Sequence, residues 1–479
     1  MKLSEILSGV EIKDARVGMG VEITGITCDS RKVKPGDVFV AIRGYESDGH
    51  MYIAAALTSG AVCIICEEPP EENGPYITAE NTRRALSVMA ANFYGRPADK
   101  MKIIGVTGTN GKTTTTNLLK TIIEDATGAK VGLIGTNRNM VGNTEIKTER
   151  TTPEASELQA LFSQMYSVGC EYVIMEVSSH ALFLDRVYGV MFEVGVFTNL
   201  TTDHLDFHKS MEAYGMAKSI LFSQCRKGVV NMDDDYSGNI MASAKCPVFT
   251  YSAENTEADL SAKSIDLKPD GVTFVALMTG TLEKIHLGIP GMFSVYNALA
   301  AASAALQLDI TLGAASNALS RCKGVMGRAE VVPTGGNYTV LIDYAHTPDA
   351  LQNIIKAAKG FSRGRVVTLF GCGGDRDKTK RPVMGRIAME LSDFVIITSD
   401  NPRTEEPSAI IADIIKGTEG LKTPHIVIEN RKEAIGWAIS NARPNDTIIL
   451  AGKGHETYQV IGREKHHFDE REIIAEILK

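Results

Sequence analysis

The chain has 479 residues, of which 44% are hydrophobic and 23% are charged, and its formal net charge is −8. This length predicts about three domains, each large enough to bury a core of its own. The acidic balance, without a long basic run, argues against nucleic acid as the main partner, and no run approaches the roughly 18 apolar residues that a membrane span requires.

The eight cysteines are scattered along the chain. The one close pair, Cys63 and Cys66, lies in an apolar run at 61–66 that is typical of a buried strand, and no second pair completes a zinc site. We therefore expect buried structural thiols, with a metal or redox role as the less favoured alternative. Free cysteines and an N-terminus without an apolar signal region predict a cytoplasmic protein.

The first block, residues 1–99, alternates apolar runs with helical patterns. Strands are expected at 38–42 and 61–66, and helices at 52–59 and 82–94. The sequence Gly95-Arg96-Pro97 ends the last helix and is typical of a linker.

The second block, residues 100–330, opens with a phosphate-binding pattern. An apolar pair at 103–104 precedes a glycine-rich turn that contains Gly108 and Gly111, then Lys112 and Thr113, and a helical pattern follows at 114–123. Glycines let backbone N–H groups approach phosphate oxygens, the lysine adds a full positive charge, and the threonine hydroxyl suits Mg²⁺. The strict motif has glycine where this chain has Val106, but the order of elements predicts a nucleoside triphosphate site.

The rest of the second block continues this alternation. Further strands are expected at 131–134, 172–177 and 194–197, and helices at 154–168, 211–224 and 297–306. Alternation of this kind predicts a parallel sheet with helices on both faces.

The third block, residues 331–479, repeats the pattern. Strands are expected at 339–343, 366–370, 394–398 and 447–450. They predict an open α/β domain of the nucleotide-binding type. The dinucleotide fingerprint fails at Arg376, so a dinucleotide ligand is disfavoured.

Polar residues follow two strands of the second block, where ligands gather in open α/β sheets. Glu176 lies at the end of one predicted strand, and His204 follows the next. With Thr113 of the loop, they are candidates to hold the cation that accompanies the phosphates. The alternatives are a helix N-cap or surface acid for Glu176 and a structural histidine for His204.

Lys218 lies in a helical pattern among small and apolar neighbours. Desolvation there would lower its pKa and favour the neutral amine, which can react with CO₂ to form an acidic carbamate. The alternative is a lysine that extends along the surface and keeps its charge in water.

The third block places two arginines and two acids at predicted strand ends: Arg376, Arg403, Asp400 and Glu456. Together they would hold a zwitterion, with carboxylates on the arginines and an ammonium group on the acids. The alternative is a surface network of ion pairs.

Motifs in all three blocks, from Asp29-Ser30-Arg31 to Gly454-His455-Glu456, resemble those of the Mur ligases, the ATP-dependent amide-forming enzymes of peptidoglycan synthesis. The loop at 107–114 is similar to that of folylpolyglutamate synthetases as well and is only moderately specific. The more specific motifs are Thr151-Thr152-Pro153, Glu176-Val177-Ser178-Ser179-His180, Asp203-His204-Leu205-Asp206 and Asp400-Asn401-Pro402-Arg403.

The resemblance implies three α/β domains. An N-terminal domain at 1–99 would bind the UDP-sugar, a central parallel-sheet P-loop ATPase domain would span 100–330, and a Rossmann-like domain at 331–479 would bind the incoming amino acid. It also implies that the protein needs Mg²⁺, and we expect a monomer.

The resemblance also implies site roles. The ATP-binding residues would be Gly108, Thr109, Asn110, Gly111, Lys112, Thr113, Thr114, Asn297, Arg328, Asp343 and His346. Ser30, Thr151, Thr152, Ser178 and Arg186 would bind UDP-N-acetylmuramoyl-L-alanyl-D-glutamate. Arg376, Asp400, Asn401, Pro402, Arg403, Gly452 and Glu456 would bind the amino acid. Thr113, Glu176, His204 and Lys218, the last as N6-carboxylysine, would hold the metal, and Lys112, His204 and Lys218 would be catalytic.

Arg403 is the residue that we expect to distinguish meso-diaminopimelate from lysine. Meso-diaminopimelate has a second carboxylate on its distal carbon, which a guanidinium can pair bidentately, and lysine does not. A site built around such a group can reject the analogue that lacks it by about 10⁴-fold or more. The family pattern Asp-Asn-Pro-Arg likewise goes with members that add diaminopimelate.

Three alternatives remain at this point. A lysine-adding relative would differ at Arg403, and a folylpolyglutamate synthetase would not match the first block or the motif at 400–403. A regulatory P-loop NTPase would hydrolyse ATP without any amino acid.

Overall fold

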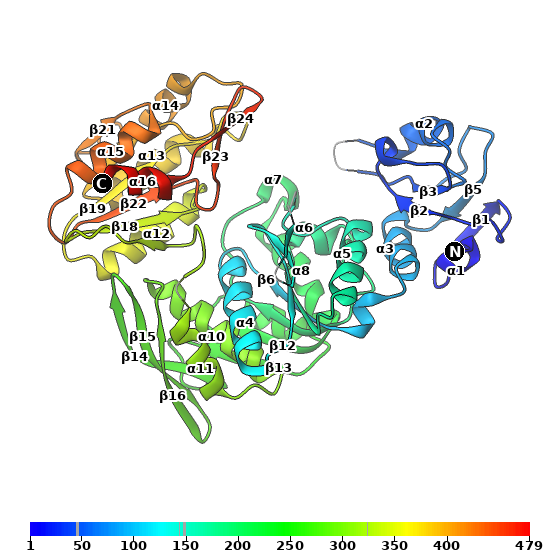
Figure 1. Cartoon of the computed structure of the whole chain (residues 1–479), viewed down its shortest axis with the longest axis horizontal. Coiled ribbons are helices and arrows are strands. Elements are labelled where there is room, and N and C mark those ends of the chain that lie inside the picture. The colour runs from blue at the N-terminus through cyan, green and yellow to red at the C-terminus, as the bar shows by residue number, and fades with distance from the viewer. Residues whose placement is uncertain (45–46, 143, 147–149, 323) are drawn as a thin grey trace. The chain divides into compact units, whose positions relative to one another are not determined.

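The computed structural model describes residues 1–44, 47–142, 144–146, 150–322 and 324–479. The chain divides into two compact units, Met1–Phe249 and Thr250–Lys479. The first contains an N-terminal sheet and the parallel strands around the glycine-rich loop, and the second contains a meander and a further parallel sheet (Figure 1). The predicted α/β class is therefore confirmed, and no described helix is long and apolar enough to cross a bilayer.

The N-terminal sheet has the strand order β1-β5-β4-β3-β2, in which β1 is antiparallel to β5 and the other pairs are parallel. Its strands are β1 (Ile12–Arg16), β2 (Gly25–Thr27), β3 (Asp37–Val40), β4 (Cys63–Cys66) and β5 (Tyr76–Ala79). The helices are α1 (Leu3–Ile6), α2 (Ile53–Thr58) and α3 (Thr82–Phe93). Alternate strand residues form two cores, one with α1 and α3 and the other with α2, so both faces of the sheet are covered.

The cysteines behave as the sequence predicted. All eight are free, and Cys63 and Cys66 are buried in β4. Burial raises the pKa of the Cys63 thiol to about 12 and that of Cys66 to about 11. Thiols of this kind are inert packing groups near neutral pH.

The central sheet of the first unit has the order β12-β11-β6-β10-β7-β8-β9. Its strands are β6 (Lys102–Thr107), β7 (Val131–Ile134), β8 (Asn139–Val141), β9 (Thr144–Ile146), β10 (Tyr172–Glu176), β11 (Phe192–Phe197) and β12 (Cys225–Asn231). The strands from β12 to β7 run parallel, whereas β8 and β9 are antiparallel additions at one edge. The carboxyl ends of β6, β10 and β11 therefore lie side by side.

Helices connect these strands. They are α4 (Lys112–Thr127), α5 (Ala155–Ser167), α6 (Ser179–Phe183), α7 (Leu205–His208), α8 (Met211–Ser219) and α9 (Ser237–Ser243). The long helix expected at 211–224 is shorter, because α8 gives way to a 3₁₀ turn at Ile220–Ser223. This turn buries Leu221 and Phe222 in the core before β12 begins.

The second unit begins with a meander that the sequence did not predict. Strand β13 (Val248–Ser252) carries the boundary between the units, and β14 (Leu260–Lys268), β15 (Gly271–Met278) and β16 (Thr281–Leu287) follow as antiparallel neighbours (Figure 1). Two helices pack on this meander, α10 (Met292–Leu306) and α11 (Leu312–Arg321). The predicted helix at 297–306 is the second part of α10.

The C-terminal sheet has the order β17-β18-β22-β19-β20-β21, parallel except for β17. Its strands are β17 (Glu330–Val332), β18 (Thr339–Asp343), β19 (Val366–Phe370), β20 (Phe394–Ile397), β21 (His425–Val427) and β22 (Thr447–Ala451). The helices are α12 (Pro348–Phe361), α13 (Lys380–Leu391), α14 (Pro407–Ile415), α15 (Arg431–Ser440) and α16 (Glu470–Ile477). A hairpin of β23 (Tyr458–Ile461) and β24 (Glu464–His467) follows β22.

Candidate active site

The glycine-rich loop lies between β6 and α4, as the sequence predicted. Gly108 and Gly111 have φ angles of +146° and +85°, in the region that favours glycine. A Cβ on Gly108 would lie 1.9 Å from the Thr198 hydroxyl oxygen, so no larger residue fits there. Lys112 opens α4, and its ammonium donates hydrogen bonds of 2.8 Å to the carbonyl oxygens of both Gly108 and Thr109.

The end of β11 supports this loop. The Thr198 hydroxyl donates to the Asn110 carbonyl at 2.6 Å, and the Asn199 side-chain oxygen accepts from the Asn110 N–H at 2.8 Å. The Asn199 carbonyl accepts from the Thr109 N–H at 2.8 Å. Sequence reasoning did not select Thr198 or Asn199, although their position directly after a predicted strand was a usable signal.

Glu176 is only 1% exposed at the end of β10. Its Oε1 accepts from the Thr113 hydroxyl at 2.9 Å and from the Thr136 N–H at 2.8 Å, and its Oε2 accepts from the Thr136 hydroxyl at 3.0 Å. The residue that caps α6 is Ser178. The alternatives of a surface acid and a helix N-cap are therefore wrong for Glu176.

His204 and Lys218 both approach Tyr214. The Lys218 ammonium lies 4.2 Å from the centroid of the Tyr214 ring, and the His204 ring centroid lies 6.0 Å from it. The Tyr214 hydroxyl is 3.2 Å from the Thr109 hydroxyl of the loop. The structure thus brings both predicted residues to the vicinity of the phosphate loop.

Lys218 is 1% exposed, so the alternative of a surface lysine is wrong. Burial, together with the positive charge of Lys112, lowers the pKa of Lys218 well below its ordinary value. Burial also lowers the pKa of His204, and Lys112 and Lys218 add to this effect. Both groups therefore tend towards their neutral forms, which are the forms that react with CO₂ or bind a metal.

The candidate metal ligands include a pair of oxygen atoms, Thr113 Oγ1 and Glu176 Oε1, at 2.9 Å from each other. Hydroxyl and carboxylate oxygens suit Mg²⁺, so these two residues fit the predicted ion. Within the described part of the chain, no group of three or more His, Cys, Asp and Glu side chains forms a metal cluster. A carbamate on Lys218 would add an acidic group that the unmodified side chains do not provide.

The residues expected to bind the muramoyl dipeptide gather beside Glu176. Thr152 donates to the Glu176 carbonyl at 2.8 Å and accepts from the Ser178 N–H at 3.1 Å. The Thr151 hydroxyl is 3.0 Å from that of Thr136. Arg186 donates to the Thr152 carbonyl at 3.2 Å and pairs with Glu154 at 2.7 Å, a partner that sequence reasoning did not select.

Ser30 begins a short 3₁₀ helix after β2, and Asp29 caps it. The same turn contains Lys32, which pairs with Glu157 of α5 at 3.3 Å. The predicted contact residue for the UDP-sugar therefore lies in a turn that is tied to the helix after Thr151 and Thr152.

Three of the nucleotide-binding residues expected from the second unit, Arg328, Asp343 and His346, lie around the end of β18. Asp343 accepts from the backbone N–H groups of Ala329 and Ala345 at 2.7 and 2.9 Å, and burial raises its pKa although Arg328 opposes the shift. The Arg328 guanidinium lies 5.2 Å from the centroid of Tyr344, whose ring lies 4.7 Å from that of His346. Asn297 is buried in α10.

Arg376 and Arg403 approach the same glycine. A Cβ on Gly373 would lie 2.9 Å from Arg403 Nη1 and 3.9 Å from Arg376 Cγ. Arg403 has a positive φ of 52° and donates to the Gly374 carbonyl at 2.7 Å. The two predicted carboxylate-binding side chains thus lie at one place on the sheet edge.

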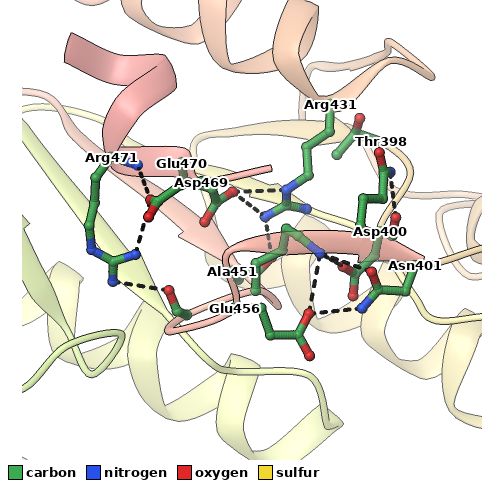
Figure 2. A network of polar contacts seen from close by, with 12 residues as sticks. Thr398, Asp400, Asn401, Arg431, Ala451, Glu456, Asp469, Glu470 and Arg471 are labelled. Carbon is green, nitrogen blue, oxygen red and sulfur yellow. Dashed lines mark hydrogen bonds and ion pairs between the residues drawn. The ribbon is translucent and has the colours of Figure 1, made fainter. Parts of the chain in front are cut away.

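The predicted acids lie around a residue that sequence reasoning did not select (Figure 2). The buried ammonium of Lys453 donates to Asp400, Asn401 and Glu456 at 3.3, 3.0 and 3.2 Å. Gly452 has a φ of +115°, and a Cβ there would lie 3.4 Å from Asp400 Oδ2. Lys453 is therefore at the centre of the predicted amino-acid site, and a lysine in the turn after β22 was the only sequence signal for it.

Three protein-family models match this chain. Models of the Mur ligase middle domain, the Mur ligase glutamate ligase domain and the Mur ligase family catalytic domain match residues 106–305, 327–454 and 22–94. A curated protein of Clostridium tetani is 47% identical over 486 residues, covering 100% of this chain and 99% of that protein. The chain belongs to the Mur ligase family.

That Mur ligase relative is named UDP-N-acetylmuramoyl-L-alanyl-D-glutamate--2,6-diaminopimelate ligase. A relative from Caldanaerobacter subterraneus with the same name is 48% identical and covers 100% of this chain and 99% of its own length. A solved structure of a ligase with this name has a TM-score of 0.73 and 32% identity, covering 100% of this chain and 98% of that one. MurF ligase from Thermotoga maritima in complex with ADP shares the fold, with a TM-score of 0.62 and 19% identity over 96% and 97% of the two chains.

Proposed function

We propose that this chain is an ATP-dependent ligase that joins meso-diaminopimelate to UDP-N-acetylmuramoyl-L-alanyl-D-glutamate, in the cytoplasm, for peptidoglycan synthesis. The observation that carries the proposal is the position of Arg403 beside Gly373, in the segment after β20 that also carries Asp400, whose carboxylate shares the Lys453 ammonium with Glu456. The names of relatives that cover the whole chain support the same activity.

The reaction has two steps. The γ-carboxylate of D-glutamate attacks the γ-phosphorus of ATP, which forms an acyl phosphate and releases ADP. An amine of diaminopimelate then attacks the acyl carbon, forms the amide and expels phosphate as the amine loses a proton. No protein nucleophile is required.

The loop supplies positioning and charge for the first step. Backbone N–H groups at the start of α4 face the phosphates, and Lys112 stabilises the negative charge on the transferred phosphoryl group. Thr151, Thr152, Ser178 and Arg186 hold the dipeptide. Asn297, Arg328, Asp343 and His346 contact the nucleotide, and Ser30 contacts the UDP-sugar.

Thr113 and Glu176 would hold Mg²⁺, with His204 and a carbamate on Lys218 completing its surroundings. The bound ion supplies positive charge that offsets the charge on the phosphates. The carbamate forms when the neutral Lys218 amine attacks CO₂ and loses a proton, and the lowered pKa of Lys218 supports this step.

Arg376 and Arg403 bind carboxylates of the amino acid, and Asp400 and Glu456 bind its ammonium group. A lysine acceptor would leave the Arg403 charge without its partner, which disfavours the lysine-adding alternative. We also propose that the enzyme is a monomer with domains at 1–99, 100–330 and 331–479.

One assay tests the function directly. Phosphate release is measured with ATP, Mg²⁺ and the UDP-muramoyl dipeptide, with either meso-diaminopimelate or lysine as acceptor. We expect release that depends on meso-diaminopimelate and is at least about 10³-fold less efficient with lysine. Equal rates with both acceptors, or release without any acceptor, would contradict the proposal.

A further inference from the structure

Lys453 is fully buried, with a relative exposure of 0%, at the end of β22. Its ammonium has three hydrogens, and three side-chain oxygens accept from it: Asp400 Oδ1, Asn401 Oδ1 and Glu456 Oε2. These oxygens come from the segments after two different strands, β20 and β22. Lys453 therefore connects the two strand ends that carry the proposed amino-acid site, and Figure 2 labels its partners Asp400, Asn401 and Glu456.

The lysine and the Val460 N–H together fix how the Asn401 amide is oriented. Asn401 Oδ1 accepts from Lys453 and from the backbone N–H of Val460 at 2.9 Å, so its Nδ2 is directed to Glu456 Oε2 at 2.8 Å. A rotation of this amide by 180° would place its NH₂ group against the ammonium, where neither can accept a hydrogen bond. One carboxylate oxygen of Glu456 is thereby held by both Lys453 and Asn401.

This orientation extends to Arg403 through the backbone. The backbone N–H of Val460 in β23 donates to Asn401, and the Val460 carbonyl accepts from the Arg403 N–H at 3.1 Å. The Gly462 N–H in turn donates to the Arg403 carbonyl. Arg403 is in a left-handed conformation, which requires support from its surroundings. The contacts from Lys453 to Asn401, to β23 and to Arg403 form one continuous path.

Both buried cations in this region are paired with acids. Behind Lys453, Arg431 donates to Glu470 at 2.9 Å and to the Ala451 carbonyl at 2.8 Å. Of the acids that pair with Arg431 and Lys453, Glu470 and Asp400 are buried and Glu456 is partly exposed.

We propose that Lys453 is a positioning residue for the amino-acid acceptor: it holds Asn401 and Glu456 in their binding orientation and, through β23, supports Arg403. It does not touch the acceptor itself, because it is completely enclosed. The inference rests on the proposed function, in that the site in question is taken to bind meso-diaminopimelate.

The test compares the full-length enzyme with Lys453→Met, which removes the ammonium while keeping a flexible side chain of similar length. We expect the KM for meso-diaminopimelate to rise about tenfold or more, because the amino-acid site loses charge-assisted hydrogen bonds. The KM for ATP should change less than about threefold, because the nucleotide site does not lose them. The preference for meso-diaminopimelate over lysine should fall at least about fivefold, because Arg403 loses its support. Lys432→Met, which removes an exposed partner of Glu476, should leave all three quantities unchanged.

Loss of the ammonium leaves the buried Asp400 and the partly exposed Glu456 without this counter-charge, which can destabilise the fold. If Lys453→Met does not fold, Lys453→Gln takes its place: its amide still donates hydrogen bonds but carries no charge, so smaller changes in the same direction are expected. Unchanged or tighter acceptor binding in the folded variant, or equal effects on acceptor and ATP, would overturn the positioning role. Failure of the wild-type enzyme to use meso-diaminopimelate would contradict the proposed function instead, and wild-type kinetics are therefore measured first.

Discussion

The Thr113 hydroxyl donates a 2.9 Å hydrogen bond to Oε1 of the buried Glu176 carboxylate, which joins the second residue of α4 to the end of β10. Two elements from different parts of the sequence thus present adjacent oxygen atoms beside the phosphate loop. This is the arrangement that suits a bound Mg²⁺ ion.

Replacement of Thr113 by valine should therefore weaken the binding of Mg²⁺ to the enzyme. We expect the Mg²⁺ concentration for half-maximal activity to rise about tenfold, because one oxygen ligand and one hydrogen bond to Glu176 are lost. Thr113→Ser keeps the hydroxyl and should retain the wild-type Mg²⁺ response. A serine variant as impaired as the valine variant would point to packing rather than to the hydroxyl.

Lys112→Ala should reduce phosphate release by about 10³-fold or more, because the ammonium that stabilises the transferred phosphoryl group is absent. The measurement is the rate of phosphate release at saturating substrates. Lys120→Ala is the matched control, since Lys120 lies on the same helix and forms an ion pair with Glu124. Near-normal turnover of Lys112→Ala would remove the basis for the phosphate-loop assignment.

Lys218→Ala should lose activity that short carboxylates such as acetate or formate partly restore. Burial lowers the pKa of Lys218, so a larger fraction of its amine is neutral and able to react with CO₂ than in an exposed lysine at the same pH. Wild-type enzyme depleted of CO₂ should accordingly regain activity when bicarbonate is added. Absence of both effects would leave the carbamate without support.

Arg403→Lys should reduce the preference of the enzyme for meso-diaminopimelate over lysine more than it reduces the overall activity. A lysine keeps the charge but cannot pair a carboxylate bidentately, so the ratio of kcat/KM for meso-diaminopimelate over lysine should fall by about 10²-fold. The KM for ATP serves as the internal reference and should stay within about threefold. If the ratio is unchanged while both acceptors bind less well, Arg403 does not recognise the distal carboxylate.

Glu405, in the segment between β20 and α14, should stabilise the fold near neutral pH and lose this effect in acid. The buried Arg381 donates to both oxygens of Glu405 at 2.9 and 3.0 Å, and this pairing lowers the pKa of Glu405 to about 2. Because the folded pKa lies below the ordinary value of 4.5, the stabilisation is fully present above pH 4.5 and is lost as the pH falls towards about 2. The difference in Tm between wild type and Glu405→Gln should therefore be largest near neutral pH and should shrink below pH 4.5. A difference that does not depend on pH would contradict this role.

The predicted family and α/β class are confirmed, because both can be recognised from short stretches of sequence. Strands such as β10 and β18 are short apolar runs followed by polar residues, and the glycine-rich loop has a pattern of its own. The meander of β14, β15 and β16 was missed, because β14 and β16 carry mixed polar and apolar residues, and the apolar run at 274–278 in β15 was not followed by a helical pattern of the alternating kind. The domain boundaries at 99/100 and 330/331 and the assigned ligand contacts stay predictions.

By itself, the sequence determined the residue types at each strand end: a lysine and threonine after β6, an acid after β10, and an Asp-Asn-Pro-Arg segment after β20. Only the tertiary structure decided how those ends meet. Thr113 and Glu176 bond because β6 and β10 are parallel neighbours in one sheet. Lys453 is enclosed by Asp400, Asn401 and Glu456 because packing removes it from water, and a buried charge must find partners. Burial and strand pairing are properties of contacts between distant residues, which no local pattern encodes.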